Sequence, residues 1–347
     1  MLKRQVFKTA NGDIEQLTIY NSTGANVVLS SFGAGVVSVN VPDKNGNIAD
    51  VCLGYADPES YFEDGPCAGK IPGRFANRIA AGTFKIGEEI YHTPINNGPN
   101  TCHSGKNGFQ NRNWSLVDTD DNSVTFQYVA TDGETGFPGK LTATAKYRWT
   151  ENNALELELK ATTDAPTIVN LTNHAYWNLA GHNSGTVLTH FLKLNADYYL
   201  PTDATLVPIG ILATVEETPM DFRQAKQIGR DICQDFAALK FGKGYDNCWA
   251  INGYEAGKMK VAAILSDNSS GRVLTVSTDQ PGVQIYTGNW LNGSPLNKAS
   301  RAYQDYDGVA IECQDFPDAP NKPEFPPVLL LPDQEYCRHI VFKFDAE

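Results

Sequence analysis

The chain has 347 residues, of which 41% are hydrophobic and 20% are charged, and its formal net charge is −12. This composition is typical of a globular protein that is long enough to bury a sizeable core without disulfides or a structural metal. Nucleic acid and anionic membranes bind clustered Lys and Arg, so the acidic balance and the lack of a basic run exclude both as expected partners.

The seven cysteines are scattered and no two have C-x-x-C spacing, so the sequence predicts neither a disulfide framework nor a zinc site. Scattered thiols are typical of a reducing compartment. No run of about 18 apolar residues occurs, and residues 1–7 show no apolar stretch behind their charges. We therefore expect no transmembrane helix, no signal peptide and a cytoplasmic location.

Taken in chain order, the predicted elements are nearly all strands. Apolar and polar residues alternate at residues 124–129, 142–149, 154–161, 273–278 and 340–344. Pairs such as Asn45-Gly46 and Asp132-Gly133 between the strands tolerate the positive φ that tight hairpins demand.

Two segments depart from the alternating pattern. Apolar residues recur at steps of three and four from Phe222 to Leu239, which predicts a helix that Gly229 interrupts. Residues 315–327 contain five prolines and cannot form a central strand, so we expect an ordered loop over the surface near residue 312. No linker or repeat divides the chain, so we expect an all-β fold: one large antiparallel β-sandwich domain over residues 1–347, with one or two short helices.

Two histidines lie in unusual surroundings. His103 lies in a turn-rich stretch, residues 97–105, and His174 lies in residues 170–179, where asparagines and aromatic residues are interleaved. A lone histidine is more often a hydrogen-bonded structural residue. Here the flanking Tyr176 and Trp177 favour a polar cleft with an aromatic surface, because aromatic faces suit the C–H surfaces of sugars and amides suit their hydroxyls.

Four charged residues have a structural interpretation, and Glu312 and Arg78 also have a functional one. Glu312 ends an apolar run, where a carboxylate is costly unless it is hydrogen-bonded or functional, although a strand-end surface glutamate also fits. Asp246 lies in a glycine-rich stretch and fits ordinary turn chemistry. Arg74 and Arg78 are each interpreted as a surface charge or as an ion-pair partner. The guanidinium of Arg78 could instead donate hydrogen bonds to two vicinal hydroxyls. No phosphate-binding glycine loop, nucleophile elbow or spaced metal-ligand set is present.

Together these motifs resemble the galactose mutarotase (aldose 1-epimerase) family, over a range from about Phe7 to Phe344. The matching segments, in the family's order, are residues 73–79, 97–103, 171–179, 243–246, 280–289 and 311–314. The resemblance implies a single large β-sandwich of extended antiparallel sheets, the galactose mutarotase-like supersandwich. It also implies a small-molecule sugar substrate, no metal and no cofactor.

The resemblance assigns roles to individual residues. It implies that Glu312 is the general base, that His174 is the general acid, and that His103 lies near the ring oxygen and the anomeric hydroxyl. The positions that match residues holding substrate hydroxyls are Asn77, Arg78, Asp246 and Gln284. Trp177 and Tyr176 are our own candidates for packing surfaces.

Two departures from the family pattern bear on substrate preference. The family commonly has Leu-His-Gly-Gly around the first histidine, and this chain has Cys102-His103-Ser104-Gly105. Ser104 is thus a candidate for one additional hydroxyl contact. Asn247 follows Asp246 where the family often has histidine.

The expected reaction interconverts the α and β anomers of a free aldose such as D-galactose or D-glucose. A carboxylate facing a histidine suits it, because one group must remove a proton while the other donates one, and the roles reverse on ring closure. Three alternatives remain open: a hexose-6-phosphate 1-epimerase, which needs converging cations; a glycoside hydrolase or lyase using Asp246 with Glu312; and a carbohydrate-binding module. The expected assembly is a monomer or a homodimer.

Overall fold

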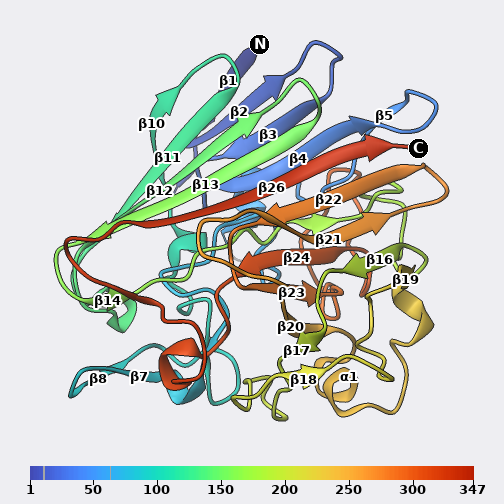
Figure 1. Cartoon of the computed structure of the whole chain (residues 1–347). Coiled ribbons are helices and arrows are strands. Elements are labelled where there is room, and N and C mark those ends of the chain that lie inside the picture. Colours follow the sequence, from blue (N-terminus) through green and yellow to red (C-terminus); the bar gives the residue numbers. More distant parts are fainter. Residues whose placement is uncertain (11, 63) are drawn as a thin grey trace.

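The computed structural model describes residues 1–10, 12–62 and 64–347, and these form three large antiparallel sheets (Figure 1). The first sheet has five strands, and each pairs with its neighbour in sequence because short turns join them. In spatial order its strands are β1 (Leu2–Phe7), β2 (Ile14–Tyr20), β3 (Asn26–Ser30), β4 (Gly35–Pro42) and β5 (Ile48–Asp50).

The second sheet has nine strands and contains all five of the strands predicted from alternation, which confirms that prediction. The last strand of the chain lies in the middle of this sheet, between β13 and β22, and so joins its two halves. In spatial order the strands are β10 (Ser115–Thr119), β11 (Ser123–Ala130), β12 (Leu141–Trp149), β13 (Ala154–Thr163), β26 (Tyr336–Ala346), β22 (Arg272–Thr278), β21 (Lys260–Ser266), β16 (Phe191–Leu194) and β19 (Lys226–Gln227).

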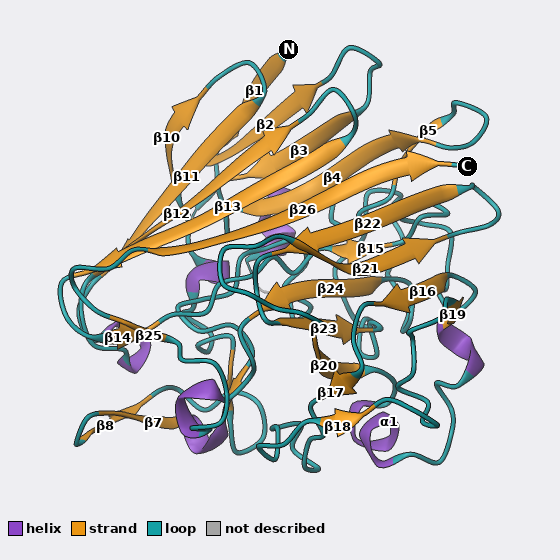
Figure 2. Ribbon diagram, in the orientation of Figure 1, coloured by secondary structure: helices purple, strands orange, loops and turns teal. Residues whose placement is uncertain are grey.

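The third sheet has six strands and lies below the nine-stranded sheet in the view of Figure 2. Its strands, in spatial order, are β15 (Tyr176–Trp177), β24 (Val309–Gln314), β23 (Gly282–Tyr286), β20 (Asp246–Ala250), β17 (Tyr198–Tyr199) and β18 (Ala213–Thr214). Three two-stranded antiparallel pairs remain: β6 (Arg78–Ile79) with β9 (Thr101–Cys102), β7 (Thr83–Ile86) with β8 (Glu89–His92), and β14 (Thr167–Ile168) with β25 (Leu329–Leu330).

One core joins the three sheets. Along β13, Leu155, Leu157 and Leu159 are buried while the residues between them are partly exposed, so the nine-stranded sheet has an inner and an outer face. The inner face packs in one apolar cluster with Leu29 of the five-stranded sheet and Ile311 of the six-stranded sheet. This arrangement is a β-sandwich, as predicted. Among the described residues, no helix has the length and apolar character that crossing a bilayer requires.

The predicted helix between Phe222 and Leu239 is wrong for most of its length. This segment contains β19, a 3₁₀ turn and only the start of α1 (Ala237–Gly242), which is the one α-helix in the described chain. Four of the apolar residues, Phe222, Ile228, Ile232 and Leu239, are buried, but mostly in a loop that winds over the sheet edge, whereas Ala225 is exposed. Gly229 fits closely there, since a Cβ atom would lie 2.9 Å from the carbonyl oxygen of Leu188. The 3₁₀ turns are η1 (Pro58–Tyr61), η2 (Ala80–Gly82), η3 (Phe109–Asn111), η4 (Glu134–Gly136), η5 (Ile228–Arg230) and η6 (Ala319–Asn321).

The proline-rich segment forms an ordered loop, as predicted. It follows β24 directly, contains η6, and packs on the loop that carries the β6 strand. The backbone N–H of Asp318 donates to the carbonyl oxygen of Arg78 at 2.8 Å, and the Asp318 carboxylate accepts from the backbone of Ala80 at 2.9 Å. The loop therefore supports the backbone of a predicted site residue.

Candidate active site

Strand alternation determines which residues of the six-stranded sheet face away from the core. In β24, Val309, Ile311 and Cys313 belong to the main core, so Glu312 points to the opposite side. β24 is a central strand, paired with β15 and β23, and all six of its residues are buried. Glu312 thus lies in the middle of a rigid sheet and is only 2% exposed.

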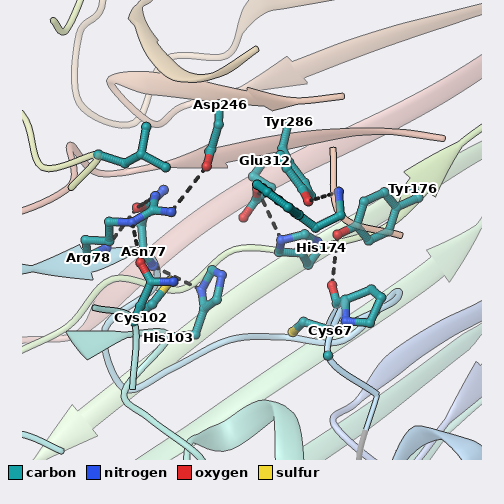
Figure 3. A pocket seen from close by; sticks show the side chains of 15 residues that line it. Cys67, Asn77, Arg78, Cys102, His103, His174, Tyr176, Asp246, Tyr286 and Glu312 are labelled. Carbon is teal, nitrogen blue, oxygen red and sulfur yellow. Dashed lines mark hydrogen bonds and ion pairs between the residues drawn. The ribbon is translucent and has the colours of Figure 1, made fainter. Parts of the chain in front are cut away.

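A cavity of about 240 Å³ lies over this second face of the sheet (Figure 3). Its volume is below the roughly 300–1,000 Å³ typical of sites for drug-sized ligands, so it suits a single small ring. Loops from the first third of the chain close it on the side opposite Glu312. The predicted residues that line it are Asn77, Arg78, His103, His174, Tyr176, Asp246 and Glu312.

Glu312 and His174 face each other in this cavity. The Nε2 atom of His174 lies 3.4 Å from Oε1 of Glu312, and His174 is 5% exposed. The His174 backbone is fixed on both sides, because its N–H donates to Lys70 O at 2.9 Å and its carbonyl accepts from Gly69 N at 3.0 Å. A carboxylate and an imidazole from distant parts of the chain therefore lie side by side.

Burial perturbs both groups, in opposite directions. It raises the pKa of Glu312 well above its ordinary 4.5, with a smaller contribution from the nearby negative charge of Asp246. Burial lowers the pKa of His174 to about 4, which the charge of Asp246 partly opposes. Each shift disfavours the charged form, so the Glu312 carboxylate becomes a stronger base and a His174 imidazolium a stronger acid.

His103 lies beside His174 and has a defined tautomer. The two rings are nearly perpendicular, at 80°, with centroids 5.3 Å apart. The backbone N–H of Asn77 donates to Nδ1 of His103 at 3.1 Å. Burial, together with His174 and Arg78, lowers the pKa of His103 well below 6.5, so the ring is neutral. Its proton is then on Nε2, which makes His103 a hydrogen-bond donor.

The other polar predicted residues form one connected network. Nη2 of Arg78 lies 3.2 Å from Oδ2 of Asp246, and Nε2 of Gln284 donates to Oδ1 of Asp246 at 2.6 Å. Oδ1 of Asn77 accepts from the backbone N–H of Arg78 at 2.8 Å. Gln284 is directly opposite Glu312 in the sheet register but does not line the cavity, so it orients Asp246.

The prediction that Trp177 offers a packing surface to a sugar is wrong. Trp177 is fully buried and packs against Phe342 and Phe344 in the core. Tyr176 precedes it in β15, so the two side chains point to opposite faces of the sheet. Tyr176 lines the cavity, with its ring centroid 5.0 Å from that of His174 and its hydroxyl bonded to Pro66 O at 2.9 Å.

The cavity also contains residues that sequence reasoning missed. Oδ1 of Asn97 accepts from Nε of Arg78 at 3.0 Å, and Asn97 stands in the turn-rich stretch before His103. Tyr286 ends β23, two residues after Gln284, so period-two alternation could have identified it. Trp290 is 64% exposed at the rim, and Cys67 comes from a segment without a signal in the sequence.

The comparisons with known proteins show the family to which the chain belongs. The family model described as aldose 1-epimerase matches residues 15–343. The chain belongs to the aldose 1-epimerase family. The galactose mutarotase of Rattus norvegicus is 38% identical over 338 residues, which cover 97% of this chain and 96% of that protein. The aldose 1-epimerase of Escherichia coli K12 is 38% identical over 95% of each chain. The crystal structure of an aldose epimerase homologue from C. elegans superposes with a TM-score of 0.88 at 31% identity, covering 99% of each chain.

Ser104, the departure from the pattern common among aldose 1-epimerases, is a structural residue in this member of the family. Its side chain is fully buried. Its hydroxyl accepts from Phe75 N at 2.9 Å and donates to Phe75 O at 3.1 Å. Ser104 therefore holds the His103 loop against the loop of Arg78 and adds no contact to the cavity.

Arg74 differs from both of its predicted roles. It is 1% exposed, and the structure shows no ion pair for it within the described residues. Its Nη1 donates to Pro138 O at 2.7 Å and to the Thr167 hydroxyl at 3.1 Å. Burial lowers the pKa of this guanidinium to about 10. Arg74 thus joins neighbouring loops and does not face the cavity.

Proposed function

We propose that the protein is an aldose 1-epimerase that interconverts the α and β anomers of a free aldose such as D-galactose or D-glucose. The observation that carries this proposal is the meeting of Glu312 and His174, 3.4 Å apart, on the wall of a cavity sized for a single sugar ring. Family membership and the identity to named epimerases support it.

In the proposed mechanism, the carboxylate of Glu312 takes the proton from the C1 hydroxyl. The electron pair left on that oxygen forms the aldehyde C=O, the bond from C1 to the ring oxygen breaks, and His174 gives a proton to the ring oxygen. Rotation about the C1–C2 bond then presents the other face of the aldehyde. The ring closes with both proton transfers reversed, so the pair regains its original protonation. Only protons move, so the chemistry requires no cofactor.

The pKa shifts match these roles. A carboxylate whose pKa is raised takes a proton from a hydroxyl more readily, and an imidazolium whose pKa is lowered gives one up more readily. The neutral His103, with its proton on Nε2, donates a hydrogen bond to the oxygen on which charge develops.

The remaining residues hold the far side of the ring. Arg78 and Asp246 present a donor fork and a carboxylate on the cavity wall, and Asn77 and Gln284 keep them in place. Tyr176 forms the adjoining aromatic wall. Contacts at the far hydroxyls fix the ring while leaving C1 free to rotate, as the reaction requires.

The site does not favour the three alternatives. A phosphorylated hexose needs converging cations, but Arg78 is the one Lys or Arg among the described residues that line the cavity, and Asp246 already pairs with it. The same pairing occupies Asp246, which a glycosidase would use opposite Glu312. A binding module has no need of an acid–base pair with shifted pKa values.

We also propose a cytoplasmic protein of carbohydrate metabolism, acting as a monomer or homodimer, in which residues 1–347 form one domain. All seven cysteines are unpaired, which is typical of a reducing compartment. The main core draws side chains from Leu17 near one end of the chain to Phe344 near the other, and this supports a single domain.

Polarimetry of freshly dissolved α-D-galactose and α-D-glucose tests the proposed reaction. We expect Glu312→Gln and His174→Ala each to lower kcat by at least about 10²-fold, because each removes one positioned proton-transfer group. The matched controls Glu335→Gln and His92→Ala replace exposed residues of the same types and should retain the wild-type rate. Wild-type rates in both cavity variants would refute the proposal.

A further inference from the structure

A second cluster of metal-ligating side chains lies on the outer face of the nine-stranded sheet, away from the core and the cavity. Cys337 and His339 are two residues apart in β26 and so project from the same face. Glu158 of β13 is the register partner of His339, directly across the strand pair. Figure 1 shows β13 and β26 as neighbours in the middle of this sheet.

Asp279, immediately after β22, orients the histidine of this cluster. Asp279 is 2% exposed, and its Oδ1 accepts from the backbone N–H of His339 at 2.8 Å. Its Oδ2 lies 2.8 Å from Nδ1 of His339. This contact places a proton on Nδ1 and leaves the lone pair of Nε2 directed toward Glu158 and Cys337. A buried carboxylate bonded to the far nitrogen of a histidine is the usual support for a metal-binding imidazole.

The three potential ligand atoms converge at distances close to those of a tetrahedral metal site. Nε2 of His339 lies 3.5 Å from Oε2 of Glu158 and 3.9 Å from Sγ of Cys337, and the three ligand atoms all lie within 4.8 Å of one another. Zinc bonds of about 2.0–2.3 Å in tetrahedral geometry separate neighbouring ligand atoms by about 3.3–3.6 Å. Small rotations of these partly buried side chains would bring the atoms to those separations.

We propose that Glu158, Cys337 and His339 bind a divalent transition-metal ion of the zinc class. Sulfur, imidazole nitrogen and a carboxylate oxygen together suit zinc and not Mg²⁺ or Ca²⁺, which take oxygen ligands. A water molecule takes the fourth position. The ion replaces Lys160, whose Nζ lies 3.3 Å from Oε2 of Glu158 and which is free to turn toward solvent because its side chain is 37% exposed. This site is independent of the proposed epimerase chemistry.

Titration of the chelator-treated full-length protein with Co²⁺ tests the site. We expect a thiolate-to-cobalt charge-transfer band in the near ultraviolet, together with the visible bands of tetrahedral Co²⁺, and loss of both on adding Zn²⁺. Cys337→Ser should abolish the charge-transfer band, while the matched control Cys233→Ser, at an exposed cysteine outside the cluster, should retain it. A band that survives in Cys337→Ser, or no band in the wild type at millimolar Co²⁺, would overturn the proposal.

The Co²⁺ affinity of an Asp279 variant tests whether Asp279 orients His339. Asp279→Asn should weaken Co²⁺ affinity by about 10–100-fold, as loss of such supporting carboxylates does elsewhere. The far-ultraviolet circular dichroism spectrum and the polarimetric rate should stay at wild-type values, because Asp279 does not line the cavity. Unchanged Co²⁺ affinity in a folded Asp279→Asn protein would contradict this geometry, whether or not the epimerase proposal holds.

Discussion

The buried ion pair between Asp246 and Arg78 provides a test of how the cavity wall is held. Their side chains are 13% and 9% exposed, so solvent screens the pair weakly. Asp246→Asn keeps the shape but has one acceptor oxygen, so Arg78 and Gln284 can no longer both donate to it, and it exchanges charge-assisted bonding of about 1.5–3 kcal/mol for neutral bonding of about 0.5–1.5 kcal/mol. We therefore predict a loss of about 1–2 kcal/mol in the free energy of unfolding. Asp246→Ala, which leaves the guanidinium buried without its partner, should cost about 3–5 kcal/mol.

The same substitution should change the pH dependence of activity. Burial is the main cause of the raised pKa of Glu312, and the like charge of Asp246 adds to it. In Asp246→Asn that charge is gone, so Glu312 loses its proton at a lower pH. The alkaline limb of kcat/KM should therefore move to lower pH, and KM should rise because a contact to the sugar weakens.

Urea unfolding and polarimetric pH profiles measure the two effects. The matched control is Glu255→Gln, since Glu255 pairs with Lys258 on the surface, where the side chains are 55% and 65% exposed. Its stability should change by no more than about 0.5 kcal/mol and its pH profile should not move. The reasoning fails if Asp246→Asn unfolds like this control and its alkaline limb stays in place.

Three further predictions concern the wild type and two buried residues. The active pair carries one proton in total, so kcat/KM should be bell-shaped, with an acid limb set by protonation of His174 at about pH 4 and an alkaline limb set by deprotonation of Glu312, whose pKa burial raises. An acid limb near pH 6.5, the ordinary histidine pKa, would contradict the lowered pKa of His174. Ser104→Ala should lose about 1–3 kcal/mol of unfolding free energy in urea titrations with KM unchanged, because both hydroxyl bonds are to buried backbone. Trp177→Phe should likewise lose about 0.5–3 kcal/mol without affecting KM, and a raised KM would show that the indole does reach the sugar.

Local pattern was sufficient to predict five of the nine strands of the nine-stranded sheet. Residues 142–149 and 154–161 alternate because one face of β12 and β13 packs on the core while the other meets solvent. The same reasoning failed between Phe222 and Leu239. There Phe222, Ile228, Ile232 and Leu239 join the main core from a 3₁₀ turn, loops and the start of α1, so the spacing of three and four does not require one continuous helix.

Some features of the site were likewise predictable from local pattern, and others depend on tertiary structure. Because Tyr176 and Trp177 are adjacent in β15, their side chains point to opposite faces of the sheet. Had the pair been assigned to a strand, the sequence would have excluded one of them from the cavity. The contact between Gln284 and Asp246 was not visible in the sequence, because it depends on the register that places β20 beside β23. Register is a tertiary property, set by packing over whole sheets.

Burial of the acid–base pair links the stability of the fold to its proposed chemistry. Oε2 of Glu312 and Nδ1 of His174 find no hydrogen-bond partner among the described residues, and an unmet buried polar group costs about 1–3 kcal/mol. A β-sandwich with an extensive core can sustain that cost, whereas a surface site would avoid it but would leave both pKa values near their ordinary range. In the proposed complex, hydroxyls of the sugar would hydrogen-bond the carboxylate of Glu312, which lines the cavity. The same burial that shifts the two pKa values therefore also favours binding of a small polyhydroxylated ligand over an apolar one of equal size.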